Sequence, residues 1–480
     1  VDTNPELYAL PLAFSPGGDG PARAGGIVEL TAQTGGQRGV VGDAFGFPAF
    51  AKALLELIRL RERIHNGQGE IEATNMPALR QILNGGIPAE PVVCGTAEGN
   101  VTLFFGDKLA LKFFRRLETG VNPELEIGRF LTERNFAHSP ALLGALECAG
   151  TGCGPVTLAV AKAFIPHAQN AWEFILDSIS RYYDRVFADA AQGHAPPSAP
   201  GEGAEDVGTS LEFARHLGVR SAELHLELAA GDAGDDFSVE PMTPQYLRGL
   251  FQSMRSLAVK NLRLLRKLAK TLPPDLAPVV QRVIELEPAI VQRYRQLVEQ
   301  RFMAGRIRVS GDFHLGQALW TGRDFIFLDF EGNQALPISE RRIKRSPLGD
   351  VARMLRSFHH VAYAGFHQQV ELGVISRENL PKFEPWVRHW NHAVSHAYMQ
   401  AYCEKMRPSG ILPVEENKLR VLLLAYLLNE VMDELGRELR LRSDNVRAPL
   451  QAILLLMEQS LPVRAPEPTE TKTATNKTNN

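Results

Sequence analysis

The alternation of apolar and polar positions in the first third of the chain predicts short strands. Residues 7–14 and 27–31 are brief apolar runs, and turn-forming Gly and Pro residues lie between them. Residues 100–114 carry two more apolar runs joined by a Gly-Asp dipeptide, which is typical of a hairpin turn. A fifth apolar run, residues 156–165, is followed by a proline. The N-terminal third is therefore expected to be rich in strands.

Two segments among these strands show helical spacing instead. Residues 47–64 repeat apolar positions every three to four residues, with Pro48 near the start, where a helix tolerates proline. The second segment begins at Asn122, a plausible N-cap, and Pro123 follows at the first helical position with glutamates in the first turns. We expect one helix in each segment.

Helical spacing dominates the chain from residue 172 onward. We expect helices at residues 172–187, 210–230, 243–272, 275–303, 385–405 and 418–440. Residues 191–209 are rich in Pro, Gly and Ala and are expected to form a loop. The polar tail from Arg464 carries too little apolar surface to bury, so we expect it to be disordered.

One short segment inside the helical part breaks this pattern. It reads RIRVSGDFHLGQALWTGRDFIFLDFEG and contains β-like runs at residues 307–309 and 325–328. Asp312 and Asp329 each follow one of these runs, and Gln317 lies between them. Carboxylate and carboxamide oxygens are the ligands that a hard cation such as Mg²⁺ prefers. The segment therefore predicts a polar site at two neighbouring strand ends.

Composition narrows the class of protein. A chain of 480 residues with 44% hydrophobic and 22% charged residues is ordinary for a soluble globular protein of about two to three folding units. The 52 basic and 55 acidic residues give a net charge of -3, which argues against binding to nucleic acid or a membrane surface through bulk charge. No apolar run reaches the roughly 18 residues that a membrane span needs.

Two further features bear on the compartment. The four cysteines form no Cys-x-x-Cys pair and indicate free thiols of a reducing compartment, so we expect a cytoplasmic protein. The N-terminus lacks the basic start of a signal peptide. The chain does not begin with Met, and we interpret it as a processed product or a piece of something longer.

The order of these elements is that of a protein-kinase-like fold of the α+β class. A strand-rich module comes first, then a hairpin carrying Lys112, a helix carrying Glu126, a strand and a large helical body. Phosphoryl transfer from a nucleoside triphosphate needs a cation on the phosphates, oxygen ligands for Mg²⁺ and a group that orients the acceptor hydroxyl. Lys112, with Glu126 as its partner, would supply the cation. Gln317 and Asp329 would supply the oxygen ligands for Mg²⁺, and Asp312 would orient the acceptor hydroxyl.

Each of these residues taken alone also fits a structural role. A lysine in an amphipathic strand or a glutamate on a helix is usually solvated, and Gly-Asp and Asp-Phe are common turn dipeptides. The order of these residues along the chain favours a functional role, because purely structural roles would not predict that order. The absence of a Gly-Lys-Ser/Thr motif argues against a P-loop kinase. Asp350, in SPLGDVARML, is expected to tie the Asp312 loop to a helix.

Three stretches resemble the maltokinase family, which is related to the aminoglycoside phosphotransferases. They are LALKFFRRLETGVNPELEIGRFLTE, SGDFHLGQALW and FIFLDFEGNQALPISERRIKRSPLGDVARMLRSF, and the resemblance covers residues 45–455. It implies a bilobal kinase-like fold with an N-terminal strand-rich cap subdomain at residues 1–85, a nucleotide-binding N-lobe at 86–167, a large helical C-lobe at 168–463 and a disordered tail at 464–480. The N-terminal stretch is especially similar to the maltokinase part of fusions with trehalose synthase.

The resemblance implies a role for each matching residue. Asp312 would be the catalytic aspartate, and Gln317 and Asp329 would bind Mg²⁺. Lys112 would contact the phosphates of ATP, and Glu126 would be the partner of Lys112 in this ATP-binding site.

The resemblance also implies candidates for nucleotide and substrate binding. The loop GTAEGNVT takes the place of the phosphate-covering loop, so Gly99, Asn100 and Thr102 are candidate ATP-binding residues, although the loop lacks a Gly-x-Gly-x-x-Gly motif. His314 and Arg442 are candidate substrate-binding residues. A packing role fits His314 equally well.

The chain departs from the family pattern at several positions. Ser310 stands where a histidine usually precedes the Gly-Asp pair. Glu430 and Asp433 replace a common lysine and tyrosine, and Ser443 and Asn445 replace a common proline and tryptophan. The four later positions lie near the expected acceptor site, so they leave the acceptor sugar open.

The function implied by the resemblance is the ATP-dependent phosphorylation of maltose to maltose 1-phosphate, with Mg²⁺ as cofactor, in α-glucan and trehalose metabolism. Two alternatives stay open. The first is a kinase of the same fold that acts on another sugar such as glucosamine. The second is a degenerate kinase domain that binds or regulates a fused or partner trehalose synthase. Ser310 and the altered late helix favour the second alternative, and the retained acids and lysine argue against it.

Overall fold

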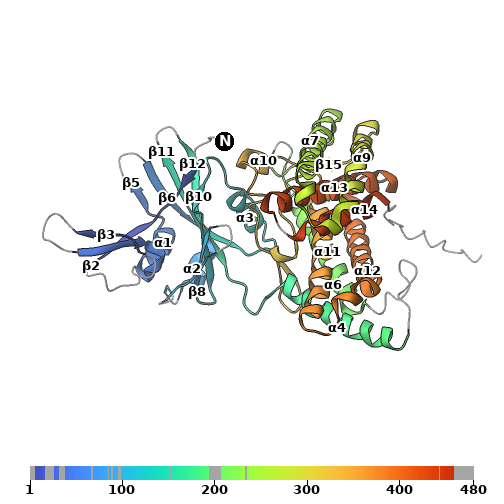
Figure 1. The fold of residues 1–480 in the computed structure, drawn as a ribbon. Coiled ribbons are helices and arrows are strands. Elements are labelled where there is room, and N and C mark those ends of the chain that lie inside the picture. Colours follow the sequence, from blue (N-terminus) through green and yellow to red (C-terminus); the bar gives the residue numbers. More distant parts are fainter. Residues whose placement is uncertain are drawn as a thin grey trace, which may run out of the picture. The chain divides into compact units, whose positions relative to one another are not determined.

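The protein is described by a computed structural model that covers residues 6–16, 26–31, 38–65, 69–84, 86–87, 90–95, 99–150, 153–193, 207–232, 235–442 and 444–458 (Figure 1). Its internal contacts divide the chain into two compact units. The first comprises Val1–Arg185, Glu223–Glu240 and Arg306–Val374, and the second Val186–Ala222, Pro241–Gly305 and Ile375–Asn480. The expected loop at 191–209 lies mostly outside the described residues, and the tail from Arg464 lies entirely outside them.

The first unit is built around a seven-stranded antiparallel sheet with the order β5-β6-β11-β12-β9-β8-β7. The strands are β5 (Arg63–His65), β6 (Gly69–Asn75), β7 (Val92–Gly95), β8 (Val101–Phe105), β9 (Leu109–Phe113), β11 (Leu142–Gly150) and β12 (Cys153–Ala163). Strands β8 and β9 form the predicted hairpin, with Val101 opposite Phe113. Strands β5 and β6 belong to the predicted segment 1–85 and extend this sheet through the pairing of β6 with β11. The domain boundaries stay a prediction.

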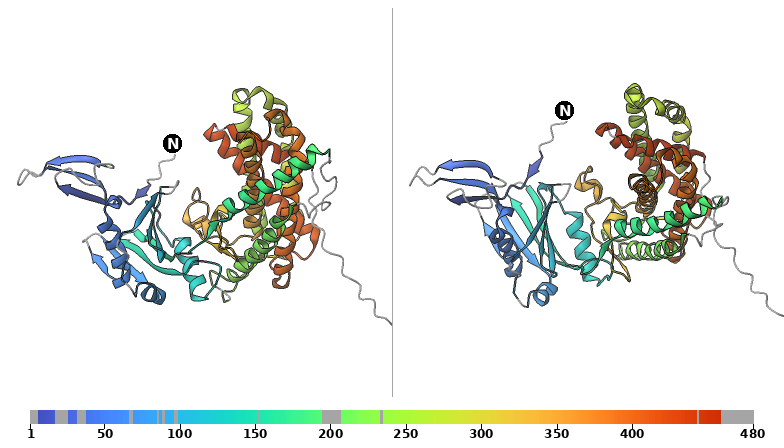
Figure 2. Two further views of the ribbon diagram at one scale, coloured as in Figure 1. Left: turned by 90° about the horizontal axis from the view of Figure 1, so that it is seen from below. Right: turned by 60° about the horizontal axis from the view of Figure 1, so that its bottom comes forward.

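Helices cover both faces of this sheet, because alternate residues of its strands point to opposite sides. Helices α1 (Pro48–Leu60) and α2 (Pro77–Ile82) pack on one face, where Leu55 joins the larger core of the sheet. Helix α3 (Pro123–Glu133) packs on the other face through Leu125. Figure 2 shows α1 and α2, in blue, and α3, in teal, on opposite sides of the sheet.

Shorter strands accompany this sheet in the N-terminal part of the unit. Strand β1 (Leu7–Tyr8) pairs with β10 (Arg116–Leu117). Strands β2 (Leu12–Pro16), β4 (Arg38–Asp43) and β3 (Gly26–Thr31) form a separate sheet in that order. The strands predicted at the start of the chain are therefore confirmed.

The acid-bearing segment contains one of its two predicted β-like runs. A three-stranded sheet has the order β13-β16-β17, with the bounds Gln169–Asn170, Ala318–Trp320 and Phe325–Phe327. The prediction of a strand at 307–309 is wrong. Ile307 forms a single bridge with Arg345, and the chain then enters a turn at Gly311, whose φ of 79° an L side chain rarely adopts.

The rest of the described chain is mainly helical, as predicted. The helices are α4 (Ala171–Ala191), α6 (Thr209–Glu227), α7 (Pro244–Leu268), α8 (Ala277–Glu285), α9 (Glu287–Glu299), α10 (Ile338–Arg341), α11 (Leu348–Glu371), α12 (Leu380–Met406), α13 (Glu416–Leu441) and α14 (Arg447–Glu458). The short strands β14 (Glu240–Pro241) and β15 (Gly305–Arg306) fall at the unit boundaries. The stretch predicted as one helix at 275–303 is two helices, because Pro288 lies in the first turn of α9 and cannot continue α8.

The second unit packs its helices closely around α13. Asn261 of α7 is fully buried and donates its Nδ2–H to the backbone oxygen of Met432 at 2.7 Å. Gly436 makes this approach possible, since a Cβ there would lie 2.3 Å from the Asn261 side chain. The neighbouring helix thus accepts a hydrogen bond from the buried Asn261 amide, whose Oδ1 has no hydrogen-bond partner among the described residues.

Among the described residues, no helix combines the length and the apolar character that crossing a membrane requires.

Candidate active site

The loop that carries Asp312 is fixed to helix α11 through Asp350. The backbone N–H groups of Ser310 and Gly311 donate to the Asp350 carboxylate at 2.8 and 3.0 Å. Asp350 lies in the first turn of α11 and is buried. Hydrogen bonds to a carboxylate that is shielded from water are stronger than neutral ones. The structural role predicted for Asp350 is confirmed.

A buried histidine that the sequence did not single out joins this anchor. His225, near the end of α6, places Nε2 at 3.3 Å from Oδ2 of Asp350, and its ring centre lies 5.7 Å from that of Phe313. The side chain is fully buried. The two partners are 125 residues apart in the chain, so hydrophobic spacing contains no signal for this contact.

Asp312 projects from this loop and lies between two basic side chains. Arg353 of α11 donates its Nη1–H to Oδ1 at 3.0 Å, and Nε2 of His314 lies 3.7 Å from Oδ2. Burial by itself would raise the pKa of Asp312, but the interaction with His314 and the charge of Arg353 outweigh it and hold the pKa below its usual range. Asp312 is therefore ionised at neutral pH and can accept a hydrogen bond from a hydroxyl group.

His314 is oriented by the turn that follows it. The backbone N–H of Gly316 donates to Nδ1 of His314 at 3.1 Å. A neutral imidazole whose Nδ1 accepts a hydrogen bond carries its proton on Nε2, which is the nitrogen nearer Asp312. His314 also caps the short 3-10 helix Leu315–Gln317. These contacts give His314 a structural role, and its contact with substrate stays a prediction.

Asp329 follows β17 and lies next to Lys112 of β9. Lys112 donates to Oδ2 of Asp329 at 2.8 Å and also forms an ion pair with Glu331, whose N–H donates to Oδ1 of Asp329 at 2.9 Å. Burial would raise the pKa of Asp329, but the charge of Lys112 outweighs it and lowers the pKa to about 2. Ser310 donates its Oγ–H to the backbone oxygen of Asp329 at 3.2 Å, so this unusual residue still connects the two acid-bearing loops.

The predicted pairing of Lys112 with Glu126 is wrong. The carboxylate of Glu126 instead binds Arg308 and Arg342, the latter at 2.6 Å. Residues two positions apart on an α-helix point about 200° apart, so Glu124 and Glu126 of α3 face different neighbours. Glu124 is the one that faces the lysines of the sheet.

Glu124 forms an ion pair with Lys162 of β12 and accepts the N–H of Phe330 at 2.5 Å. Lys162 also donates to the backbone oxygen of Leu328 at 2.6 Å. Neither Glu124 nor Lys162 is among the candidate site residues predicted from the sequence. The sequence does contain a signal for each of them. Glu124 lies in the first turn of the predicted helix, and Lys162 lies inside the apolar run LAVAKAFIP.

Five charged side chains thus meet in the first unit: Lys162, Glu124 and Glu331 are buried, and Lys112 and Asp329 are partly buried. Burial raises the pKa of Glu331 and, together with the charges of Asp329 and Glu124, outweighs Lys112, so that the pKa is about 7. Burial likewise raises the pKa of Glu124. Three carboxylates face two ammonium groups, and an added cation or proton would offset the remaining negative charge.

The candidate ATP-binding residues lie around Lys112. Thr102 of β8 is the register partner of Lys112 in β9. Asn100 donates its Nδ2–H to Glu331 at 3.4 Å and is buried. Gly99 has a φ of 83°, which suits a glycine in a tight loop, and the three residues before it lie outside the described part of the chain. Their contact with ATP stays a prediction.

The two candidate Mg²⁺ ligands come from adjacent chain segments. Leu328 directly precedes Asp329, and its backbone N–H donates to the backbone oxygen of Gln317 at 3.0 Å. No described residue forms a hydrogen bond with the carboxamide of Gln317, and the described residues contain no group of three His, Cys, Asp or Glu that could hold a metal. A carboxylate and a carboxamide still fit Mg²⁺, because this ion commonly takes few protein ligands beside water and phosphate oxygens.

The late positions of the sequence belong to the second unit. Arg442 caps α13 in the left-handed conformation, with a φ of 52°, and Glu430 and Asp433 lie on α13 itself. Asn445 lies in the following turn, while Ser443 is outside the described residues. The contact of Arg442 with a sugar stays a prediction.

The α+β architecture, with a strand-rich N-terminal part and a large helical part, is a bilobal protein-kinase-like fold. A solved structure of a glucosamine kinase matches it with a TM-score of 0.60 and 20% identity, over 91% of this chain and 86% of that one. A second, of a glucosamine kinase in complex with glucosamine, ADP and inorganic phosphate, has a TM-score of 0.56 and 19% identity, over 82% of this chain and 92% of that one. At these identities the likeness concerns the fold.

At the sequence level, the chain is 26% identical over 310 residues to a glucosamine kinase from Streptacidiphilus jiangxiensis. The match spans 63% of this chain and 59% of that relative, so about three-fifths of the relative's length is covered. No family model matches the chain. The resemblance to the maltokinases stays a prediction.

Proposed function

We propose that the protein is an ATP-dependent sugar kinase that uses Mg²⁺. The observation that carries this proposal is the arrangement of Asp312, Asp329 and Lys112 in the first unit. Asp312 and Asp329 lie in loops joined through Ser310, the charge of Asp329 acts on the pKa of Asp312, and Lys112 binds Asp329 directly. These are the groups that phosphoryl transfer requires, in one place.

Lys112 would bind the phosphates of ATP. Its ion pairs with Asp329 and Glu331 hold the ammonium group in the region that Asn100 and Thr102 border. A held ammonium group loses little conformational freedom when it meets a phosphate, which favours binding.

Asp329 and Gln317 would hold Mg²⁺, which neutralises charge on the phosphates when it is bound. The low pKa of Asp329 keeps that carboxylate ionised, as a metal ligand needs to be. The excess of carboxylates over ammonium groups around it also favours a bound cation.

Asp312 would accept a hydrogen bond from the acceptor hydroxyl and orient its oxygen for in-line attack. Its low pKa makes it a weak base. A weak base suffices, because the phosphoryl group passes through a loose transition state and the hydroxyl need not lose its proton early. Arg353 fixes the direction in which the carboxylate points.

For the acceptor we propose glucosamine. The relatives reported above are glucosamine kinases by name, and Glu430 and Asp433 add negative charge where the maltokinase pattern has a lysine and a tyrosine. Negative charge favours an amino sugar, which is cationic when protonated, over a neutral disaccharide. Maltose, with maltose 1-phosphate as product, is the second candidate and rests on the maltokinase resemblance. A partner or fused trehalose synthase belongs to that second candidate.

The test is a sugar panel with Mg·ATP, headed by glucosamine and maltose, in which ADP release and the phosphosugar are both measured. We expect a phosphorylated amino sugar from the unaltered protein. Asp312→Asn should lower kcat by about 10²- to 10⁴-fold, because it removes the group that orients the hydroxyl. The variant should retain Mg·ATP binding, because Asp329, Gln317 and Lys112 are untouched.

The outcomes separate the candidates. Product from maltose but not from glucosamine would keep the mechanism and change the acceptor. Binding of Mg·ATP with no phosphorylated sugar would contradict kinase activity and favour the degenerate domain. Full activity of Asp312→Asn would contradict the role of Asp312.

A further inference from the structure

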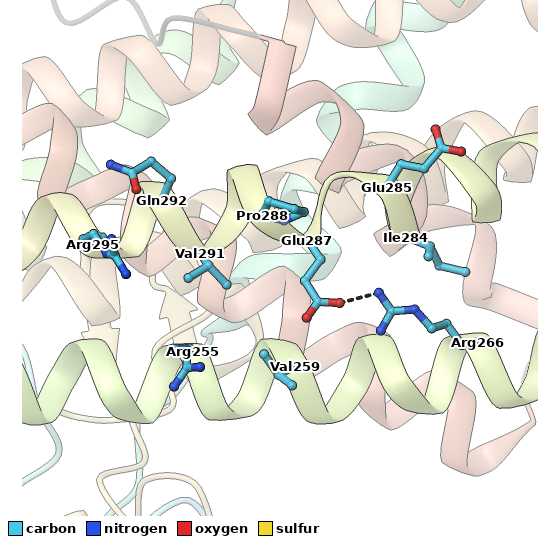
Figure 3. Close-up of a pocket in the computed structure, with 10 residues that line it drawn as sticks. All are labelled: Arg255, Val259, Arg266, Ile284, Glu285, Glu287, Pro288, Val291, Gln292 and Arg295. Carbon is cyan, nitrogen blue, oxygen red and sulfur yellow. Dashed lines mark hydrogen bonds and ion pairs between the residues drawn. The ribbon is translucent and has the colours of Figure 1, made fainter.

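The second unit contains a groove that the proposed kinase chemistry does not use. It runs between α7 and α9 and has a volume of about 590 Å³ (Figure 3). The residues that matter to its chemistry are Arg255, Val259 and Arg266 of α7 and Glu287, Val291 and Arg295 of α9. A volume of this size lies in the range of about 300 to 1,000 Å³ that is typical of small-molecule sites.

The helix on one side of the groove is strongly basic. Helix α7 carries no acidic residue, and its basic residues are Arg248, Arg255, Lys260, Arg263, Arg266 and Lys267. The whole chain has a net charge of -3, so α7 is much more positive than the rest of the chain. Such a concentration attracts anions.

The arginines of the groove differ in how they are paired. Arg266 forms an ion pair with Glu287 at one end of the groove, so its charge is compensated. Arg255 and Arg295 lie at the other end, and neither forms an ion pair with any residue that the structure describes (Figure 3). Figure 3 also shows the carboxylate of Glu285 pointing away from α7. Two guanidinium groups from different helices thus face one end of the groove without a carboxylate.

We propose that this groove binds a phosphorylated small molecule, with the phosphate on Arg255 and Arg295. The planar guanidinium group matches phosphate oxygens in pairs, and a phosphate ester carries close to two negative charges at neutral pH, which suits two arginines. Val259 and Val291 lie next to the arginines along the groove (Figure 3) and offer an apolar wall to the rest of the ligand. The pair of Arg266 and Glu287 closes the far end with a donor and an acceptor.

The groove favours a small molecule over an extended polyanion. Its two uncompensated arginines are confined to one end, whereas Lys260 and Lys267 of the same helix do not line it. At 100° per residue, those two lysines lie about 140° and 120° around α7 from Arg255. An extended polyanion would gain binding energy from the lysines and the arginines alike. A single phosphate in the groove would gain binding energy only from the two arginines.

The probes are glucose 6-phosphate and inorganic phosphate, and binding to the full chain is measured by isothermal titration calorimetry. The test variant is Arg255→Gln with Arg295→Gln. The matched control is Lys260→Gln with Lys267→Gln, which removes the same charge from the second unit. We expect glucose 6-phosphate to bind more tightly than inorganic phosphate. Its Kd should rise about 10- to 100-fold in the arginine variant and change less than about twofold in the lysine variant.

Three results would overturn the proposal. The first is binding of glucose 6-phosphate that persists in the arginine variant or is absent from the unaltered chain. The second is an equal loss of affinity in both variants, which would show that the net positive charge of the helix, and not the arginine pair, causes binding. The third is equal affinity for both probes, which would remove the role of the apolar wall. Unchanged thermal unfolding and Mg·ATP binding of the variants would show that a loss of binding is local.

Discussion

Single side chains in the candidate active site are governed by the energetics of buried charge. Lys112 and Lys162 are ammonium groups at the interior of a sheet, and each is compensated by carboxylates from another part of the chain. Desolvation of an unpaired ion costs several kcal/mol, so these partners are a condition for burying the lysines at all. The same balance leaves two carboxylates of this cluster, Glu124 and Glu331, with raised pKa values.

The raised pKa of Glu331 predicts a pH dependence of stability. Its ordinary pKa of 4.5 applies to the unfolded chain, and the folded pKa is about 7. Between these values the folded protein keeps a proton that the unfolded chain releases, so the free energy of unfolding falls as the pH rises through this window, by up to about 3 kcal/mol. Glu331→Gln has no such proton. We therefore expect it to lose less stability than the unaltered protein between pH 5 and pH 8, measured by urea denaturation without Mg²⁺ or ATP.

The control for this experiment is Glu340→Gln, which changes an exposed carboxylate of α10. It should keep the full fall in stability between pH 5 and pH 8. The same fall in the Glu331 variant would show that another group causes the pH dependence.

At the scale of secondary-structure elements, helix α3 shows how a capping residue positions a functional side chain. The Oδ1 of Asn122 accepts the N–H of Glu124 at 2.8 Å, and Pro123 fits the first turn. The cap fixes where the helix begins and therefore the direction in which Glu124 points. The sequence predicted this helix start, and the structure confirms it.

Asn122→Ala should lower the free energy of unfolding by about 1 kcal/mol, within a range of about 0.5 to 2, because it removes the cap and leaves the N–H of Glu124 without its partner. Asn122→Ser should retain most of the stability, since its hydroxyl can also cap the helix. Both are measured by urea denaturation at pH 7. A serine variant as unstable as the alanine variant would show that the loss comes from another contact of Asn122.

At the scale of the whole molecule, the two compact units contain different proposed sites. The residues proposed for phosphoryl transfer all belong to the first unit, and the basic groove belongs to the second. The cysteines offer a way to follow the units separately, since Cys94 is exposed in the first and Cys403 lies on α12 in the second.

Burial raises the pKa of Cys403 to about 12, and the thiolate is the form that reacts. With a disulfide reagent at pH 8, we expect Cys94 to react at least about 100-fold faster than Cys403, since a thiol with that pKa is almost entirely protonated. Mass spectrometry of peptides identifies the labelled site. Cys403 should react quickly only in urea concentrations that unfold the second unit. Equal rates for the two thiols in the folded protein would contradict this burial.

Local patterns predicted most elements because each depends on neighbouring residues. The turn dipeptide between β8 and β9, the cap at Asn122 and the helical spacing of α7 and α13 are all readable within a few residues. The split between α8 and α9 was missed although Pro288 was visible, because proline is also tolerated near a helix start. The strand predicted at 307–309 does not form, because a strand needs a partner along its length as well as apolar residues, and Ile307 forms only a single bridge with Arg345.

The sequence by itself determined the order of Lys112, Asp312, Gln317 and Asp329 and the anchoring role of Asp350. Only the tertiary structure decided that Glu124 rather than Glu126 faces the lysines, and that Arg353 and His225 support the Asp312 loop. Helical spacing defines a buried face but does not say which distant residue packs on it. Contacts such as that of Lys112 with Asp329 join residues 217 positions apart, and only the folded chain brings them together.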